Sequence, residues 1–335
     1  MPVKTYIIAE IGNTHEGSLG LAKKFIKVAS ECGADAVKFQ LHIFDAESLS
    51  SAPNPPYFKG ESRKNYFERT SFSIKDWIRL KKYANQLKLD FLNSPFSIEA
   101  VDCLLEIGVD IYKIPSGELT NTPLLEKIAR LNKKVYLSTG MSNWSEIDKA
   151  VGIFKKNKNS KLTLMQCTSM YPCELEYSGI NIINEFKMRY KNTAVGFSDH
   201  TLGIAAPLAA VFNGATVVEK HLTLSKHMYG SDAQNATEPK DFQILVNEIR
   251  AIEKIMNSKV DKNLISKKLQ KMKKTFEKSI VSSEDLKKGH KLTFEDLSFK
   301  KPGDGISADK YKKIIGKVLK KDIKRDEKLK FNYLL

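Results

Sequence analysis

The sequence predicts an α/β protein in which a (β/α)8 TIM barrel is followed by a small β-rich domain. Eight short apolar runs alternate with amphipathic stretches over roughly 255 residues, which is the size and rhythm of such a barrel. Nearly every run ends in polar residues, at the place where a barrel carries its chemistry. The rhythm breaks after Met256. We therefore expect a barrel over residues 1–257, a linker over 258–277 and a second domain over 278–335.

The expected strands are short and apolar, and the stretches between them repeat apolar residues at helical spacing. The strand runs are Tyr6–Ile11, Ala36–Leu41, Asp90–Asn93, Ile111–Ile114, Lys134–Leu137, Leu162–Cys167, Ala194–Phe197 and Thr216–Leu222. The helical stretches include Leu19–Cys32, Ile74–Leu87, Ile98–Ile107, Pro123–Leu131, Trp144–Phe154 and Lys240–Met256. An open, doubly wound sheet is the alternative, but it usually carries a GxGxxG phosphate loop after its first strand. That position reads GNTHEG here, so the barrel is favoured.

The C-terminal part of the chain follows a different pattern. Residues 258–277 are polar and Lys-rich, and we expect them to form a helical linker. Short β-like runs at Ser279–Val281, Leu297–Phe299 and Ile314–Val318 follow, separated by the turn sequences KKGH and KPGDG. A domain of about sixty residues buries little surface by itself, so we expect it to dock on another surface.

Composition excludes several classes of protein. Apolar residues make up 41% and charged residues 28% of the chain, which indicates a globular rather than a disordered protein. No window approaches 18 uninterrupted apolar residues, so a membrane span is not expected. The first residues lack the apolar region and cleavage site of a signal peptide, and the four cysteines show no CxxC spacing. We therefore expect a cytoplasmic protein with reduced thiols.

The positive charge is concentrated near the C-terminus. Residues 251–335 hold 24 basic and 12 acidic residues, which leaves 31 basic and 27 acidic residues in the first 250. A basic tail raises nucleic acid as a partner. However, these lysines alternate with acidic residues and few aromatic residues lie among them, unlike a basic groove with stacking aromatics. We expect a solvated, Lys-rich surface, with neither nucleic acid nor a membrane as partner.

Each strand run ends in side chains that can do chemistry. In chain order they are Glu10 with His15 after it; Lys38, Gln40 and His42; Ser94; Lys113, Ser116 and Glu118; Ser138; Gln166, Thr168 and Tyr171; Ser198, Asp199 and His200; Glu219 and His221. Any one of them is also explained as a hydrogen-bonded polar group of the core. Their convergence on one rim favours an active site, because buried charges cost several kcal/mol unless they are paired.

Two groups of side chains indicate the kind of chemistry. His200 and His221 end adjacent strands, and as neutral imidazoles they can hold one divalent ion with room for water and substrate. Lys38 and Lys113, with the serines of the rim, suit a dense anion that carries a phosphate and a carboxylate. The alternatives are two hydrogen-bonded rim histidines and two lysines that are ion-paired with Glu10 and Glu118.

In combination these residues resemble the sialic acid synthase family, which includes N-acetylneuraminate synthase and its relatives for legionaminic and pseudaminic acids. The resemblance runs along the chain through AEIGNTHEGSL, GADAVKFQLH, FLNSPFS, YKIPSGELTN, YLSTGMS, QCTSMYP, GFSDHTLG, VEKHLT and KKGHKLTFEDLSFKKPGDGI. It implies a (β/α)8 barrel followed by an antifreeze-like (SAF) domain. It also implies a domain-swapped homodimer in which each small domain covers the active site of the other protomer.

The resemblance also implies an activity: condensation of phosphoenolpyruvate with the open-chain aldehyde of an N-acylated hexosamine, with release of phosphate. On this basis His200 and His221 would ligate Mn²⁺ or Mg²⁺. The side chains that would hold phosphoenolpyruvate are Lys38, Lys113, Ser94, Ser116, Ser138 and Ser198, with Gln40 nearby. Those that would face the sugar and the attacking water are Glu10, Glu118, Asp232 and Tyr171. Lys113, Glu10 and Glu118 form the expected catalytic set, and either glutamate fits the activation of water.

Some positions depart from the family pattern. Lys301, in KKPGDG, stands where the family usually has an arginine that reaches the N-acyl group of the substrate from the partner's lid. Lysine keeps the charge but loses the two-pronged donor. Residues 43–72 do not match the family's sugar-contacting loop closely enough to carry any residue over. The form KIPSGE looks more like the neuraminic and legionaminic branches than the pseudaminic one, and the expected acceptor is N-acetylmannosamine or a 2,4-diacetamido-hexose.

Other functions remain as alternatives at this stage. One is a pseudaminic acid synthase or a spore-coat-polysaccharide-type synthase of the same family. Another is a metal-dependent aldolase on the same fold, which would need a third protein ligand to its metal and no dedicated phosphoenolpyruvate site.

Overall fold

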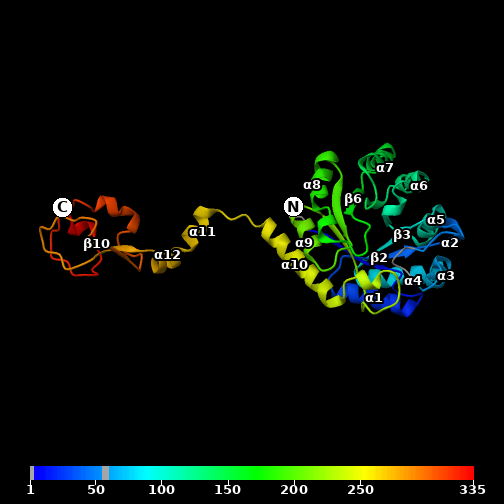
Figure 1. The fold of residues 1–335 in the computed structure, drawn as a ribbon, viewed down its shortest axis with the longest axis horizontal. Coiled ribbons are helices and arrows are strands. Elements are labelled where there is room, and N and C mark those ends of the chain that lie inside the picture. The colour runs from blue at the N-terminus through cyan, green and yellow to red at the C-terminus, as the bar shows by residue number, and fades with distance from the viewer. Residues whose placement is uncertain (1–3, 55–59) are drawn as a thin grey trace. The chain divides into compact units, whose positions relative to one another are not determined.

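The computed structural model describes residues 4–54 and 60–335, which divide into two units, Met1–Asn257 and Ser258–Leu335. In the first unit, eight parallel strands pair in chain order, and the last strand pairs with the first to close a barrel (Figure 1). Helices surround the strands, as a (β/α)8 barrel requires. The predicted fold class is therefore confirmed.

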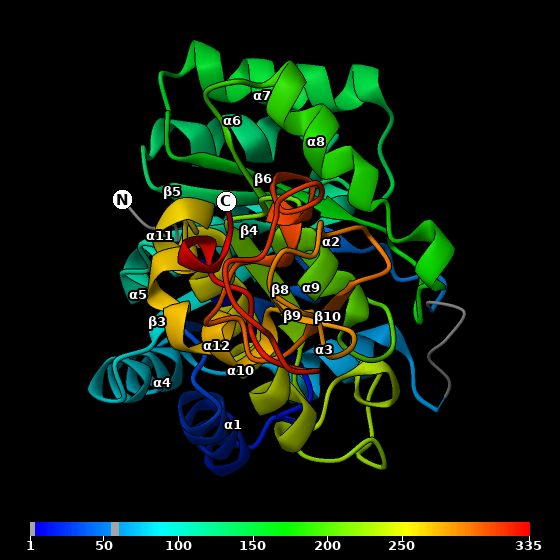
Figure 2. The same ribbon diagram turned by 90° about the vertical axis from the view of Figure 1, so that its left-hand side faces the viewer.

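The strand bounds lie within two residues of those predicted from the apolar runs. The barrel strands are β1 (Tyr6–Gly12), β2 (Ala36–Leu41), β3 (Asp90–Pro95), β4 (Ile111–Ile114), β5 (Lys134–Ser138), β6 (Leu162–Cys167), β7 (Ala194–Asp199) and β8 (Val217–His221). The helices of this unit are α1 (Leu19–Glu31), α2 (Phe44–Glu47), α3 (Arg63–Thr70), α4 (Ile74–Gln86), α5 (Ile98–Ile107), α6 (Thr122–Arg130), α7 (Trp144–Lys156), α8 (Ile180–Arg189), α9 (Ala205–Phe212) and α10 (Pro239–Asn257). Successive helices such as α6 and α7 lie side by side around the barrel (Figure 2).

Four helices of this unit were not among the predicted stretches, namely α2, α3, α8 and α9. The sequence of α9, AAPLAAVF, is apolar on all sides, so it shows no helical period. In contrast, α3 is polar and follows a loop. For α9 and for α3, the spacing of apolar residues does not distinguish a helix from other kinds of structure.

Local signals explain where the predicted helices begin. Side chains before the first turn accept hydrogen bonds from backbone N–H groups of that turn, and these caps are Ser18, Ser73, Ser97, Asn121 and Asn143. At α7 the cap is reciprocal, because Glu146 also accepts from the backbone N–H of Asn143. Such caps satisfy donors that the helix itself cannot pair.

The barrel interior is built in layers. Its apolar layer consists of Ile8, Ala36, Leu92, Tyr136, Met165 and Val217, with Ile111 packed against them. The opposite faces of the strands pack on the helices and form the larger core, which contains fully buried rings such as Phe25, Phe154 and Phe242. Because successive strand residues point to opposite faces, the residue two positions after each member of the apolar layer points into the barrel as well. This register determines which side chains form the site described below.

The second unit has its own small core. Two helices, α11 (Lys262–Lys268) and α12 (Gln270–Phe276), contain no buried residue, in keeping with the predicted helical linker. They precede an antiparallel pair of strands, β9 (Ser279–Ser282) and β10 (Leu297–Lys300). The core is apolar and consists of Ile280, Leu286, Leu292, Leu297, Ile306, Ile314, Leu319, Ile323, Leu329 and Leu334.

One predicted strand of the second unit is wrong. Residues 314–318 form a turn that follows a 3₁₀ helix, Ala308–Lys313, and only single bridges occur nearby, such as the one between Val318 and Lys291. Gly316 lies at φ +82°, which breaks an extended run. Of the apolar residues that suggested a strand, Ile314 is fully buried in the core, whereas Ile315 is exposed.

In the described residues, no helix combines the length and the apolar character that crossing a bilayer requires.

A chain truncated after Asn257 is expected to fold, because the eight strands close among themselves and the barrel core is built from the first unit. Both tryptophans, Trp77 and Trp144, lie in the barrel, so their fluorescence reports on that unit alone. Urea unfolding followed by this fluorescence should keep the midpoint and slope of the full chain. Ile314→Ala in the full chain is a matched control and should leave the transition unchanged. Loss of the transition on truncation would show that the barrel needs the second unit.

Candidate active site

A polar layer crosses the barrel interior directly above the apolar layer. Each strand supplies one side chain, two residues beyond its position in the apolar layer. From β1 to β8 these are Glu10, Lys38, Ser94, Lys113, Ser138, Cys167, Ser198 and Glu219, and each is at most 4% exposed. The layer lies at the carboxyl ends of the strands, where TIM-barrel chemistry is found.

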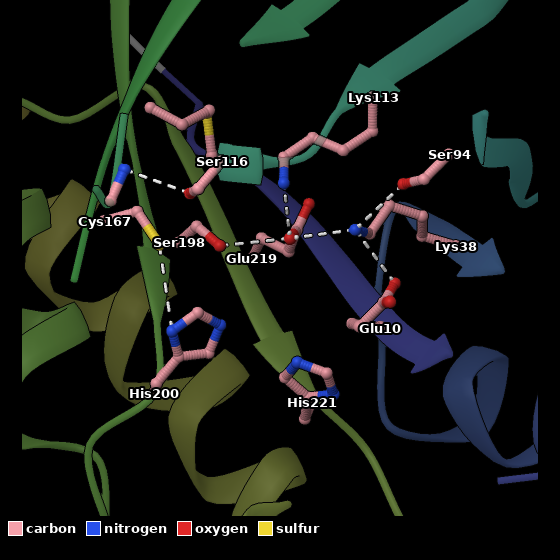
Figure 3. Close-up of polar contacts among 12 residues, drawn as sticks. Glu10, Lys38, Ser94, Lys113, Ser116, Cys167, Ser198, His200, Glu219 and His221 are labelled. Atoms are coloured by element: carbon pink, nitrogen blue, oxygen red, sulfur yellow. Dashed lines mark hydrogen bonds and ion pairs between the residues drawn. The ribbon is translucent and has the colours of Figure 1, made fainter. Parts of the chain in front are cut away.

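Glu219 is the centre of this layer (Figure 3). Its Oε1 lies 3.0 Å from Lys113 Nζ and 3.1 Å from Lys38 Nζ, and it accepts a hydrogen bond of 3.1 Å from Ser198 Oγ. Burial would raise the pKa of Glu219, but the two ammonium groups outweigh it and hold this pKa well below its usual range. Among the described residues, Glu219 Oε2 has no hydrogen-bond partner although it is buried.

The two lysines are not equally compensated. Burial would lower the pKa of Lys38, but Glu10 and Glu219 together outweigh it and raise this pKa. For Lys113 burial prevails over the attraction of Glu219, and the neighbouring Lys38 adds to the effect, so its pKa is lowered. An anion that enters beside Lys113 would therefore stabilise a charge that the protein leaves only partly balanced.

Glu10 is held by both of its oxygens. Its Oε2 lies 3.2 Å from Lys38 Nζ, and its Oε1 accepts a hydrogen bond of 3.0 Å from the Gln40 amide. Burial raises the pKa of Glu10 to about 7, although Lys38 opposes the shift and Glu219 adds to it. A carboxyl group with a pKa near neutrality can exchange a proton with water or substrate at physiological pH.

His200 and His221 are neighbours on the same side of the polar layer, with ring centroids 5.5 Å apart (Figure 3). His200 Nδ1 lies 2.9 Å from the carbonyl oxygen of Thr168, so it donates there and leaves Nε2 as a possible metal ligand. Burial lowers the pKa of His221 to about 4, which keeps the ring neutral, and its buried Nδ1 has no hydrogen-bond partner in the described part of the chain. Its nearest acid is Asp232, with Oδ2 at 3.9 Å.

These two histidines fit a divalent metal ion as an open, two-ligand site. Within residues 4–54 and 60–335, no group of three or more His, Cys, Asp or Glu side chains is arranged to hold a metal. Water and substrate would therefore supply the remaining ligands of such an ion. The environment of His200 differs from that of His221: burial would lower its pKa, but the Cys167 sulfur at 3.7 Å and the Thr168 carbonyl outweigh it and raise this pKa.

A cavity of about 430 Å³ opens above the polar layer. Glu118, Tyr171 and Asp232 line it together with the two histidines, and Phe67, Phe96 and Met141 add apolar wall. Burial raises the pKa of Glu118, whose carboxylate accepts a hydrogen bond of 2.7 Å from the Asn121 amide. The combination of apolar walls and convergent polar groups is typical of a small-molecule site.

Gly12, at the end of β1, allows Asp232 to lie close to that strand end. Its φ is +56°, and a Cβ atom there would lie only 2.7 Å from Asp232 Oδ2. The absence of a side chain thus allows the loop after β8 to approach the end of β1 closely.

The structure brings together all but one of the site residues predicted from sequence. Those that line the cavity are Glu10, Lys38, Gln40, Ser94, Lys113, Ser116, Glu118, Ser138, Tyr171, Ser198, His200, His221 and Asp232. Lys301 belongs to the second unit, where its ammonium lies 5.1 Å from the ring centroid of Phe276. The alternative for the lysines was ion pairing with Glu10 and Glu118. Lys38 does pair with Glu10, but the carboxylate that both lysines share is Glu219 and not Glu118.

Sequence reasoning missed two important side chains and misplaced others. Glu219 is among the polar strand ends but not among the predicted site residues, and Cys167 is in neither group. Strand alternation carried the signal, because Cys167 stands two residues after Met165 of the apolar layer. For the same reason Gln166 points away from the cavity and donates to the carbonyl oxygen of Ser178. His15, also noted as a polar end, is buried and stacks on Phe72.

Comparison with known proteins gives a consistent result. The NeuB family matches residues 25–261, and the SAF domain matches residues 277–334. The N,N'-diacetyllegionaminic acid synthase of Campylobacter jejuni is 42% identical over 97% of this chain and 98% of its own length. The pseudaminic acid synthase of the same species is 33% identical over 98% and 96%. A crystal structure of N-acetylneuraminic acid synthetase from Leptospira borgpetersenii, in complex with citrate, is 32% identical, with a TM-score of 0.70 over 82% of this chain and 92% of that one.

Glu219→Ala is expected to destabilise the barrel by about 3–5 kcal/mol, because it leaves two buried ammonium groups without their shared partner. Urea unfolding followed by tryptophan fluorescence measures the change. Glu126→Ala is the matched control: Glu126 also pairs with a cation, Arg130, but at the surface, and its loss should cost less than about 1 kcal/mol. Equal effects of the two substitutions would contradict the central role of Glu219.

Proposed function

The chain belongs to the NeuB family, and on that premise we propose that it is a nonulosonic acid synthase that condenses phosphoenolpyruvate with an N-acylated hexosamine and releases phosphate. The observation that carries the proposal is the buried pair Lys38 and Lys113, which share the single carboxylate Glu219 beneath a cavity of substrate size. A protein has little reason to bury two ammonium groups side by side unless an anion is to be bound there.

In this proposal the floor of the cavity binds phosphoenolpyruvate. The ammonium groups of Lys38 and Lys113 would face its negative charges, and the hydroxyl groups of the layer would donate hydrogen bonds to it. Ser138 Oγ supports this role, because it is buried and has no hydrogen-bond partner among the described residues. Ser116 also lies at the cavity, where its hydroxyl accepts a hydrogen bond of 3.0 Å from the Gly140 N–H.

The proposed reaction joins C3 of phosphoenolpyruvate to the aldehyde carbon of the open-chain sugar. The aldehyde oxygen becomes a hydroxyl group, and water adds at C2 and gives up a proton. The bond between C2 and the phosphate oxygen then breaks, which leaves a keto acid and inorganic phosphate. Glu10 is well suited to take the proton from water, because its pKa lies near 7 and Lys38 and Gln40 hold its carboxylate in place. Glu118 is the second candidate for this role.

A divalent ion, Mn²⁺ or Mg²⁺, would be held by His200 and His221. When bound there it would act as a Lewis acid that polarises the aldehyde of the acceptor.

For the acceptor we propose a 2,4-diacetamido-hexose. The synthase from Campylobacter jejuni that is 42% identical to this chain is named for N,N'-diacetyllegionaminic acid, which supports this class. Phe67, Phe96 and Met141 form an apolar part of the cavity wall. Such a wall suits the acyl and deoxy groups of this sugar better than it suits the hydroxyl groups of a fully hydroxylated sugar.

Phosphate release from phosphoenolpyruvate tests the function directly. The full-length protein should release phosphate with a 2,4-diacetamido-hexose and more slowly with N-acetylmannosamine. Lys113→Ala should lower kcat/KM for phosphoenolpyruvate by about 1–3 decades, equivalent to roughly 1.4–4 kcal/mol of transition-state stabilisation. Lys133→Ala is the control, because that lysine pairs with Asp110 at the surface. No phosphate release with any N-acylated hexosamine would refute the function, whereas unchanged phosphoenolpyruvate kinetics in Lys113→Ala would refute only this residue's role.

Removal of the metal is expected to abolish turnover, and added Mn²⁺ to restore it. His221→Ala should bind less Mn²⁺ in calorimetry while its thermal transition stays cooperative, because a rim residue contributes little to the core. His227→Ala, at an exposed position of the loop after β8, is the control and should bind the ion normally. Full activity in excess chelator would argue against a metal-assisted reaction.

For the second unit we propose that, in a domain-swapped homodimer, it supplies Lys301 to the acyl group bound by the other protomer. Lys301 is exposed and makes no ion pair with any described carboxylate, so its charge is available. Chains with Lys301→Ala should regain part of their activity when mixed with chains that carry His221→Ala, since one mixed site would have both an intact barrel and an intact lysine. Mixed dimers that form but stay inactive would contradict this arrangement.

A further inference from the structure

A chain of side-chain contacts leads from Glu10 to the loop after β2, and the proposed reaction uses none of its outer members. The Gln40 amide donates to Glu10 Oε1 at 3.0 Å, and its carbonyl oxygen lies 3.1 Å from His42 Nε2. His42 Nδ1 in turn lies 2.8 Å from Glu47 Oε1 on α2. The chain thus connects a carboxylate of the polar layer with the first helix beyond β2.

The ring of His42 is held by stacking contacts as well as by its hydrogen bonds. Its ring is sandwiched between Phe67 of α3, at a centroid distance of 3.7 Å, and Phe96 after β3, at 4.0 Å. The interplanar angles are 6° and 23°, so both contacts are stacked. Both side chains of the His42–Glu47 pair are only 7% exposed. A ring clamped on both faces and at one nitrogen presents its other nitrogen in one direction only.

The direction in which His42 Nε2 points determines the orientation of the Gln40 amide. His42 Nε2 carries the proton that the Gln40 carbonyl accepts, because the opposite end of the amide donates to Glu10. Nδ1 also carries a proton, which the Glu47 carboxylate accepts, so both ring nitrogens of His42 are donors in this arrangement. If the amide turned over, its oxygen would face the Glu10 carboxylate at about 3 Å, and its NH₂ group would face the N–H of His42. Two hydrogen bonds would be lost and two repulsive contacts formed.

We infer that His42, clamped by Glu47, Phe67 and Phe96, is a positioning residue that orients Gln40 and through it the Glu10 carboxylate. The inference rests on the proposed function, in which Glu10 takes the proton from water. Gln40 cannot pass a proton along the chain as a carboxylate or imidazole could, so the role of His42 is orientation rather than proton transfer. Lys38 holds the second oxygen of Glu10, and the two contacts together fix the plane of the carboxylate.

Kinetics of His42→Phe test the inference, because phenylalanine keeps the stacking and removes both ring nitrogens. We expect kcat to fall about 10–100-fold, as for other residues that orient a catalytic group, while the KM for phosphoenolpyruvate changes less than about 3-fold. In a Gln40→Leu background the same substitution should cost less than about 2-fold, because the group it acts through is gone. Asp45→Asn is the control: this residue is on α2, but its side chain is 81% exposed and lies outside the chain of contacts.

A second pair of variants covers the case in which His42→Phe does not fold. Glu47→Ala should lower kcat, whereas Glu47→Gln, whose carbonyl oxygen can still accept from the ring, should retain most of it. An undiminished kcat in His42→Phe or Glu47→Ala would overturn the inference. An equal loss with and without Gln40 would also overturn it, since His42 would then act independently.

A measurement without substrate separates this inference from the proposed function. The chain has six histidines, so ¹⁵N-histidine labelling gives a small set of ring signals, which His42→Phe assigns. The Nε2 signal of His42 should shift in Gln40→Leu and stay unchanged in Asp45→Asn. If the wild-type protein does not turn over phosphoenolpyruvate, the proposed function fails while this contact can still be present. If the Nε2 signal does not respond to Gln40→Leu, the positioning role fails whatever the activity.

Discussion

The balance of charge inside the barrel is the constraint on which the rest of the site depends. Two lysines and two glutamates share a space that is almost closed to solvent, with Glu219 between Lys38 and Lys113. Buried charges of one sign are tolerated only where charges of the other sign lie within contact distance. The eight-strand closure provides this, because it brings β2, β4 and β8 around one interior although they are far apart in the chain. Closure brings Glu219 to both lysines, whereas Glu10 and Lys38 are already register partners on the neighbouring strands β1 and β2.

The charges and hydrogen bonds of the polar layer are not fully balanced within the layer, and this imbalance makes the layer suited to binding a ligand. Lys113 has a lowered pKa, Glu10 has a raised one, and buried oxygen atoms of Glu219 and Ser138 lack partners among the described residues. Shifted pKa values and unsatisfied polar atoms that converge on one cavity are typical of sites that await a ligand. In the proposed reaction the anionic substrate would complete the balance.

Outside the polar layer, the loops of the barrel determine how precisely its groups are held. The end of β1 admits Asp232 closely because Gly12 has no side chain. After β2, the ring of His42 is held between Phe67 of α3 and Phe96, which follows β3. Gly12, Phe67 and Phe96 carry no reactive group, yet the contacts around them help to hold Gln40 and Glu10 in one arrangement. A rigid surround of this kind is what a catalytic carboxylate needs.

The fold class, the eight strands and most of the cavity residues could be predicted from the amino-acid sequence alone. The reason is that strand length, apolar runs and the polar residue at each strand end are local signals, and parallel closure brings all the carboxyl ends to one rim. Local signals were weaker for α9, whose apolar composition has no period, and misleading at residues 314–318, where the buried Ile314 begins a turn and no strand forms. The choice of Cys167 over Gln166 was contained in the alternation of the strand, but two other features became visible only in the folded chain: Glu219 is the shared partner of both lysines, and His42 is clamped against Gln40. Each of these depends on which strands and loops become neighbours when the barrel closes, and contacts across the barrel leave no trace in the spacing of residues along the chain.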